Sequence, residues 1–148
     1  MKTVFDKETR DALILRIENL DENAKALWGI MTICQMLKHC ALFDGMILGR
    51  MRYKRLFFGR LFGKIALKEM LRDDQPIRQN LTTLPELKVR ESLSDFKSEK
   101  IKWIGNMEAY NFFLDTYTEH AFFGKITTQQ AGLLSYKHAD HHLRQFNG

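Results

Sequence analysis

Three of the five histidines of this chain lie within five residues of one another near its C-terminus, in the run from Tyr136 to His142. His138 and His142 are four residues apart, so on a helix both imidazoles lie on one face, about 6 Å apart along the axis. Two histidines with this spacing can share one metal ion. A site of two histidines is weak, so a third ligand must come from elsewhere in the chain. His39 is the best candidate.

The three clustered histidines occupy different positions on a helical wheel. At 100° per residue, Lys137, Asp140 and Arg144 fall on the side opposite to His138 and His142. His141 lies at the edge of the inward arc, so we predict the pair His138 and His142 rather than His138 and His141. The remaining members of the inward arc are small or apolar, apart from one serine: Ala131, Leu134, Ser135 and Phe146.

His39 is expected to face the core from a second helix, because it shares an arc with Gln35, Met36, Leu42, Phe43 and Met46. Three neutral imidazoles suit one divalent metal ion, with Zn or Ni favoured and Fe, Mn or Co as alternatives. They leave a coordination position open for water or substrate, as in catalytic zinc sites. The alternative interpretation is that these are hydrogen-bonded histidines of the core or its rim.

Three further residues near these histidines could take part in chemistry. Gln35, one turn before His39, is the only catalytic candidate, and it could orient a ligand or bound water. We favour a simpler role for it, as the partner of Thr32 in a helix capping box. His120 is interpreted as a solvated loop residue before the last helix. Cys40 is interpreted as a buried, inert cysteine.

The positions of these residues require helices, and the sequence predicts four principal ones. The first begins at Asp6 and runs to about Leu20, and the second opens at the Thr32 capping box. The third starts between Ser92 and Asp95 and ends near Phe113. The fourth opens with a second capping box, formed by Thr127 and Gln130.

A long connection, Met51 to Glu91, separates the second and third helices, and it holds the two prolines of the chain. It is expected to contain a helical piece over Gly59–Arg72 and a loop over Asp73–Pro85. We see no alternating β pattern and no internal repeat. The sequence therefore predicts an all-α fold, a four-helix bundle with a long crossover between helices 2 and 3.

Composition is that of an ordinary globular protein. The 148 residues, 45% hydrophobic and 28% charged, suit a single domain over 1–148. No apolar stretch is long enough to span a membrane, and the charged N-terminus predicts no signal peptide. Cys34 and Cys40 are about 9 Å apart along one helix, too far for a disulfide, so a cytoplasmic setting is expected.

Residues 50–64 combine basic and aromatic side chains. This pattern could indicate contact with nucleic acid or a membrane surface, or a basic rim that attracts an acidic thiol. We favour a crossover segment whose aromatic residues pack on the bundle while its Lys and Arg are solvated. The net charge of +5 is too mild to require a nucleic-acid partner.

The chain resembles the DinB/YfiT-like superfamily of four-helix metal-binding proteins, and within it a bacterial branch catalogued as a domain of unknown function. The resemblance covers essentially the whole chain and implies that His39, His138 and His142 bind a divalent metal. It also implies, as an expectation, transferase or isomerase chemistry with a low-molecular-weight thiol. The matching segments are Trp28–Thr32, Gln35–Cys40, Phe123–Thr127, Tyr136–His138 and His141–Phe146.

These observations predict a metal-dependent enzyme acting on a small molecule, with a thiol transferase as the leading function and a hydrolase as an alternative. The runner-up is a non-catalytic metal-binding or interaction protein of the same fold. An open coordination position at the base of a pocket would favour the enzyme, and a sealed site with four protein ligands would favour the runner-up. Exposed apolar surface of the bundle could also support a homodimer.

Overall fold

The computed structural model describes residues 1–90 and 95–148. Within these residues most of the chain is helical, as predicted. The elements, in chain order, are α1 (Lys7–Glu18), α2 (Ile33–Ile47), α3 (Phe57–Met70), a short 3-10 helix η1 (Pro85–Leu87), α4 (Phe96–Ala109), a second 3-10 helix η2 (Tyr110–Phe112), strands β1 (Tyr117–His120) and β2 (Gly124–Thr127), and α5 (Thr128–Gln145).

The helix start signals of the sequence are confirmed. The Asp6 carboxylate accepts the backbone N–H of Thr9 at 2.9 Å, which caps α1. Thr32 and Thr127 each form a complete capping box, at the starts of α2 and α5. Asp95 caps α4, and the rest of the predicted start, residues 92–94, lies outside the described residues. The start of each histidine-bearing helix is therefore fixed by side-chain hydrogen bonds between residues that are close in sequence.

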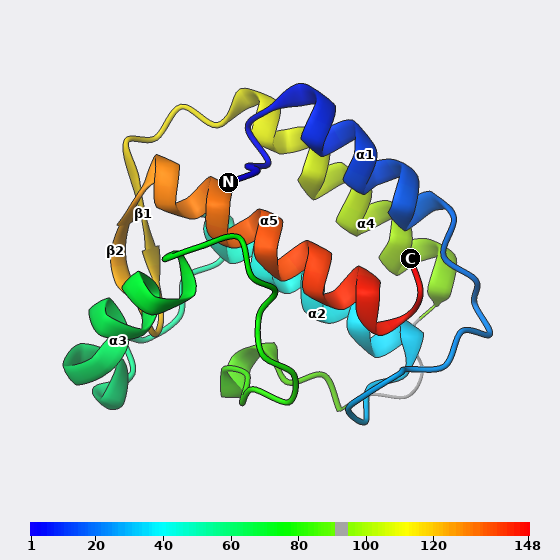
Figure 1. The fold of residues 1–148 in the computed structure, drawn as a ribbon, viewed down its shortest axis with the longest axis horizontal. Coiled ribbons are helices and arrows are strands. Elements are labelled where there is room, and N and C mark those ends of the chain that lie inside the picture. The colour runs from blue at the N-terminus through cyan, green and yellow to red at the C-terminus, as the bar shows by residue number, and fades with distance from the viewer. Residues whose placement is uncertain (91–94) are drawn as a thin grey trace.

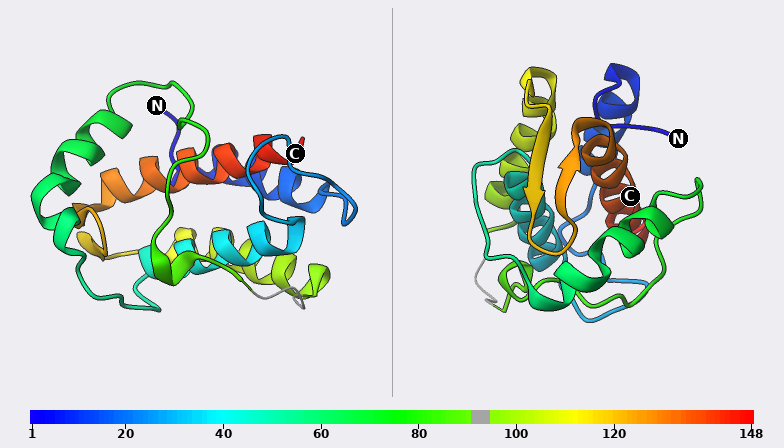
Figure 2. Two further views of the ribbon diagram at one scale, coloured as in Figure 1. Left: turned by 90° about the horizontal axis from the view of Figure 1, so that it is seen from below. Right: turned by 90° about the vertical axis from the view of Figure 1, so that its left-hand side faces the viewer.

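Helix α2 lies at the centre of the packing. Eleven of its fifteen residues are buried, and it contacts both α4 and α5. Helix α1 contacts the same two helices from the other side, so α1, α2, α4 and α5 surround a common core (Figure 1, Figure 2). Among the described residues no helix is long and apolar enough to cross a membrane.

The sequence predicts no β structure, and this prediction is wrong, because the chain forms one short β hairpin. Strands β1 and β2 pair antiparallel, with Tyr117 opposite Thr127 and His120 opposite Gly124. Each strand has only four residues, so the alternation of buried and exposed side chains is too short to be recognised from the sequence. The hydroxyl of Thr118 donates to the carbonyl of Ile47 at 2.9 Å and fastens the hairpin to the end of α2.

The crossover contains the predicted helical piece as α3 and the predicted loop beyond it. Lys137 of α5 holds this loop, since its ammonium group donates to the carbonyls of Met70 at 2.7 Å and Asp73 at 2.8 Å. The expectation that the aromatic residues of segment 50–64 pack on the bundle is wrong for three of them. Phe57, Phe58 and Phe62 are exposed on α3.

Asp140 also differs from the wheel, which placed it on the side away from the core. Its carboxylate is buried between two helices and pairs with Arg16 of α1 at 2.8 Å and Arg144 at 2.7 Å. The contact of α5 with α1 covers this face, and the wheel of a single helix cannot show such a contact. The predicted absence of a disulfide is confirmed, because Cys34 and Cys40 are both free.

Candidate metal centre

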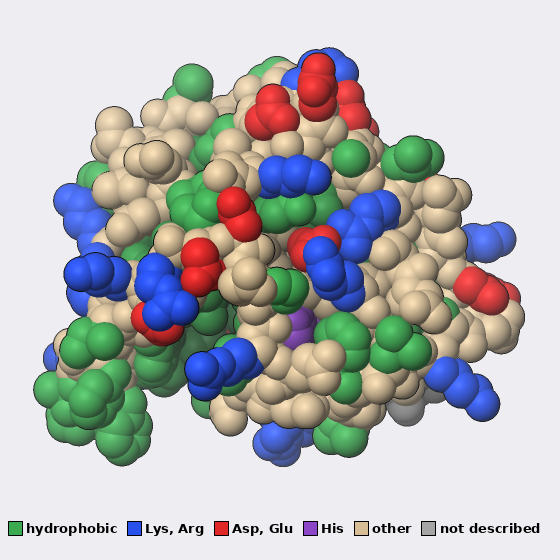
Figure 3. Space-filling view, in the orientation of Figure 1, with side chains coloured by type: hydrophobic (Ala, Val, Ile, Leu, Met, Phe, Trp, Pro, Cys, Tyr) green, Lys and Arg blue, Asp and Glu red, His purple; other side chains and the backbone are tan. Residues whose placement is uncertain are grey.

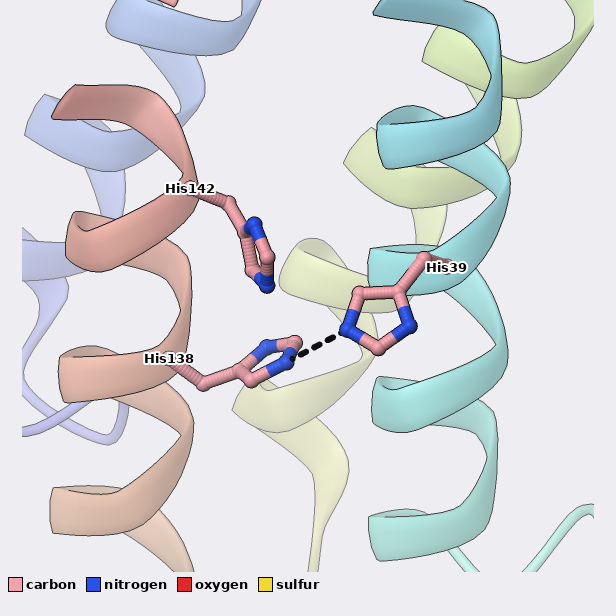
Figure 4. Close-up of side chains that lie close together, drawn as sticks. All are labelled: His39, His138 and His142. Carbon is pink, nitrogen blue, oxygen red and sulfur yellow. Dashed lines mark hydrogen bonds between the residues drawn. The ribbon is translucent and has the colours of Figure 1, made fainter. Parts of the chain in front are cut away.

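The side chains of His39, His138 and His142 converge between α2 and α5 (Figure 4). Each offers one ring nitrogen, and these three atoms lie within 4.8 Å of one another. Nε2 of His39 and Nε2 of His138 are 3.0 Å apart. The two capping boxes set where α2 and α5 start, and helix packing then brings the pair on α5 to face the single histidine on α2. The structure thus brings together the three residues chosen from the sequence.

The ring orientation of His39 is fixed by the crossover. Its Nδ1 lies 2.9 Å from the carbonyl oxygen of Leu87, in η1. A carbonyl oxygen only accepts hydrogen bonds, so Nδ1 of the neutral ring carries the proton and donates. The lone pair is then on Nε2, which is the nitrogen that faces the other two histidines. This arrangement, with the far nitrogen bonded to a carbonyl, is common for histidines that ligate metals.

His142 is oriented by Gln145 in the same way. The amide nitrogen of Gln145 donates to the carbonyl oxygen of Trp28 at 2.7 Å, so the amide oxygen faces Nδ1 of His142, 2.9 Å away. Nδ1 of His142 therefore donates, and its Nε2 is left with the lone pair. Trp28 precedes Gly29, whose φ of +76° turns the chain closely past this amide.

His138 completes the cluster, and no described residue orients its second nitrogen in this way. Its ring stacks on Phe43 with ring centres 3.8 Å apart and an interplanar angle of 15°. Because Nε2 of His39 has the lone pair, the bond between the two rings requires His138 to donate from its own Nε2. His138 must therefore move or release that proton before the same nitrogen can bind a metal.

Burial keeps all three imidazoles neutral. Desolvation lowers the pKa of His39, lowers the pKa of His142 to about 3, and brings the pKa of His138 well below its ordinary value. The neighbouring histidines add to this effect, since positive charge on one ring disfavours it on the others. Neutral imidazole is the form that ligates a metal.

The donor set fits a divalent metal ion. In a tetrahedral site with metal to nitrogen distances of 2.0–2.1 Å, ligand nitrogens lie about 3.3 Å apart. Nε2 of His39 and Nε2 of His138 are 3.0 Å apart, which is close to that distance. The three ligand nitrogens lie within 4.8 Å of one another, so a small rotation of one ring would bring all of them to the distance that a metal requires. Among the described residues, this cluster supplies three protein ligands and no fourth. These three histidines could hold a metal ion.

The other predicted residues lie around the cluster rather than in it. His141 is partly exposed at the edge, as predicted, with Nδ1 3.2 Å from the carbonyl oxygen of Ile77. Gln35 is confirmed as the capping partner of Thr32, with its side-chain oxygen 2.9 Å from the Thr32 nitrogen. Its role in orienting a ligand stays a prediction. Cys40 is fully buried, and burial raises the pKa of its thiol well above the ordinary value.

His120 was misplaced by the sequence analysis as a solvated loop residue. It lies on β1 and is 4% exposed. Its Nδ1 accepts the backbone N–H groups of Phe122 and Phe123, each at 3.1 Å, so the proton of the neutral ring is on Nε2. Burial lowers the pKa of His120 to about 3. This histidine organises the hairpin turn beside Phe43, whose ring stacks on His138.

A buried polar network beside the cluster was not predicted. Asp44 of α2 accepts hydrogen bonds from the indole N–H of Trp103 at 2.8 Å and the hydroxyl of Tyr110 at 2.7 Å. Tyr110 also contacts the hydroxyl of Ser135, three residues before His138, at 2.8 Å. Burial raises the pKa of Asp44 to about 7. The network ties the two histidine-bearing helices to α4 and η2.

Gln145 and Leu87 are the orienting residues that sequence reasoning missed. Gln145 could have been found, because it lies three residues after His142 and therefore on the same helix face. Leu87 gives no signal, because it acts through its backbone carbonyl from 48 residues away. Asp44 could have been noticed as a carboxylate within an otherwise apolar stretch of α2.

The described part of the molecule contains at least two cavities. One, of about 590 Å³, lies between the N-terminus and the crossover loop, and the other, of about 380 Å³, lies near the end of α4. Neither is lined by the three histidines. Figure 3 shows a histidine side chain at the bottom of a hollow on the face seen in Figure 1.

The comparisons with known proteins agree in one respect with the resemblance stated above. The chain matches the family described as "Protein of unknown function (DUF1569)" over residues 3–148. No curated protein and no solved structure matches it. The match covers nearly the whole chain, including all three histidines of the cluster. The chain therefore belongs to the DUF1569 family.

Proposed function

We propose that this protein is a metal-dependent enzyme that binds one divalent metal ion through His39, His138 and His142. The single observation that carries the proposal is the convergence of three neutral ring nitrogens at one point between α2 and α5. Two of the three rings are locked with their lone pairs toward that point. Zn or Ni is the preferred ion, and Fe, Mn and Co are alternatives.

Neighbouring residues of the chain orient the three imidazole rings. Leu87 and Gln145 hold the rings of His39 and His142, and Phe43 covers one face of His138. A divalent metal with three imidazole ligands supplies, when bound, a Lewis-acid position at which a thiol or water is deprotonated near neutral pH. The leading reaction class is group transfer to a low-molecular-weight thiol, and metal-dependent hydrolysis is the alternative.

The fold agrees with this proposal. We infer that α1, α2, α4 and α5 correspond to the four helices of a DinB-like bundle, with α3 and η1 in its long crossover. In that superfamily the ligand positions are one histidine on the second helix and a pair on the last helix. His39 on α2 and the His138 and His142 pair on α5 occupy these positions.

Metal analysis of protein purified without an affinity tag tests the binding. We expect about one metal ion per chain for the wild type and its loss in His138→Ala, with the helical content retained. His141→Ala is the matched control, because it removes the neighbouring histidine on the same helix but leaves the cluster intact. If His138→Ala keeps its full metal content, the assignment is wrong.

The Co²⁺-loaded protein separates an enzyme from a non-catalytic metal-binding protein, which is the second candidate function. A coordination position that accepts substrate predicts a change in visible absorption when small thiols are added, because sulfur then binds the ion. A site closed by a fourth protein ligand predicts no change.

A further inference from the structure

Helix α3 packs on the rest of the protein through a narrow face made of two glycines and one leucine. Gly59, Gly63 and Leu67 form its buried face. A methyl group at either glycine would overlap with the carbonyl oxygen of Phe122, in the turn of the β hairpin. The backbone of α3 thus lies directly against the backbone of that turn. Arg55 strengthens the contact by donating to the carbonyl oxygens of Ala121, at 3.0 Å, and Phe122.

Because the small residues face inward, the large apolar residues of α3 face solvent. Five of them are more than half exposed, from 55% for Phe62 to 69% for Phe57 and Phe58. At 100° per residue they cover one continuous arc of the helix, with the aliphatic side chains in its middle. Figure 3 shows a group of hydrophobic side chains where α3 lies, at the end of the molecule. These five residues form the α3 apolar stripe: Phe57, Phe58, Leu61, Phe62 and Ile65.

Basic side chains border this stripe on one side. Arg60 and Lys64 lie on α3 between the stripe and the buried face, and Lys68 lies within the arc of the stripe at its C-terminal end. All three are exposed. Exposed Arg52 and Lys54 precede the helix, whereas α3 itself contains one acidic residue, Glu69. The helix therefore has three sectors, one for docking to the protein, one apolar and one basic.

We propose that the α3 apolar stripe is a docking surface for an anionic lipid bilayer. An amphipathic helix that lies in the membrane interface combines large apolar side chains on one face with flanking Lys and Arg, as α3 does. The stripe would enter the boundary between headgroups and acyl chains. Arg60, Lys64 and Lys68 would remain among the anionic headgroups, to which each contributes favourable electrostatic energy.

Two other occupants fit the same surface less well. A second copy docked stripe to stripe would bring two sets of basic residues close together, which costs free energy. A nucleic acid would stack its bases on aromatic rings, but the middle of the stripe is formed by Leu61 and Ile65. Aliphatic side chains at the centre and cations at the border favour hydrocarbon beneath anionic headgroups.

Co-sedimentation of the full-length protein with lipid vesicles tests this proposal. We expect binding to vesicles of phosphatidylcholine with about one third phosphatidylserine, and at least tenfold weaker binding to phosphatidylcholine alone. The double variant Phe58→Ser/Phe62→Ser should bind the anionic vesicles at least tenfold more weakly. Phe112→Ser is the matched control, because Phe112 is 76% exposed but lies on η2, away from the stripe.

The charges have a separate readout. Replacing Arg60 and Lys68 with glutamine should weaken vesicle binding about fivefold for each residue, and high salt should reduce the difference. Circular dichroism would check that each variant is folded. Failure of the wild type to bind anionic vesicles at low salt would overturn the proposal. So would dimerisation or oligonucleotide binding that is lost in Phe58→Ser/Phe62→Ser while vesicle binding is unchanged.

Discussion

At the scale of single residues, the hydrogen-bond partner of each histidine decides which nitrogen can bind a metal. Leu87 and Gln145 fix the proton of His39 and His142 on Nδ1. His138 has no equivalent partner among the described residues, and its Nε2 donates to Nε2 of His39. Under the proposed function, His39 and His142 already present a lone pair to the metal, and His138 must first release or move the proton on its Nε2.

Gln145→Ala tests this preparation. Removal of the amide leaves Nδ1 of His142 without its acceptor and frees the ring to rotate, so metal affinity should fall by about 10–100-fold. Competition with a chelator of known affinity measures the change. Gln129→Ala, an exposed glutamine on the same helix, is the control and should keep the wild-type affinity. Equal affinity in both variants would mean that Gln145 does not position His142.

At the scale of elements, α2 carries both His39 and Asp44, so the polar network and the candidate metal centre share one helix. Burial raises the folded-state pKa of Asp44 from its ordinary value of 3.8 to about 7. Its contribution to stability is therefore fully present below about pH 3.8 and is lost as the pH rises through about 7. Ionisation of Asp44 weakens the packing of α2 on α4.

Asp44→Asn should remove this dependence. An asparagine has no ionisable group, and its amide oxygen can accept from Trp103, as the carboxyl group of Asp44 does. Between about pH 4 and pH 7 the variant should gain stability relative to the wild type, by up to about 4 kcal/mol. Urea unfolding of the metal-free proteins across this range measures the difference. Parallel profiles for the two proteins would contradict the role assigned to Asp44.

The docking of α3 makes a second prediction for an element. Gly63→Ala should destabilise this contact by about 1–3 kcal/mol, because the added methyl group overlaps with the Phe122 carbonyl. Hydrogen exchange should accelerate in α3 and the hairpin but not in α2. Gly105→Ala is the control within a helix, since no atom lies within 4 Å of its added carbon, and it should stabilise the protein by about 0.5–1 kcal/mol. Unchanged exchange in Gly63→Ala would show that the close contact is not required.

At the scale of the whole molecule, four neutral histidines, three of them buried and His138 partly buried, make folding sensitive to acid. The folded-state pKa values of His39, His120, His138 and His142 are all lowered. Their contribution to stability is present above the unfolded pKa of about 6.5 and is lost progressively as the pH falls from there toward the folded values, about 3 for His120 and His142. Acid should therefore unfold the metal-free protein.

Guanidinium unfolding of the metal-free protein between about pH 7 and pH 4.5 checks this expectation. The free energy of unfolding should decrease steadily over this range, opposite in sign to the contribution of Asp44. His142→Leu should reduce the slope, because one titrating site is removed while an apolar side chain fills the space. A slope that is unchanged in this variant would show that His142 is accessible to protons in the folded state.

Local sequence patterns determine where the helices start and on which helix faces the candidate metal ligands lie. The capping residues Asp6, Thr32 and Thr127 mark helix starts through contacts within four residues, so no tertiary information is needed to find them. The four-residue spacing of His138 and His142 places both on one helix face for the same reason. The apolar arc around His39 then indicated that it faces the core, so the candidate cluster could be predicted before the fold was known.

Only the tertiary structure decided what surrounds these elements. The Leu87 carbonyl meets His39 across 48 residues, and Asp44 meets Tyr110 across 66, so no periodicity connects them. The inward face of α3 is set by two glycines against a hairpin turn, which reverses the usual rule that large apolar side chains are buried. Whether two backbones can come this close depends on the shape of both elements. The residue pattern of one helix carries information about that helix alone.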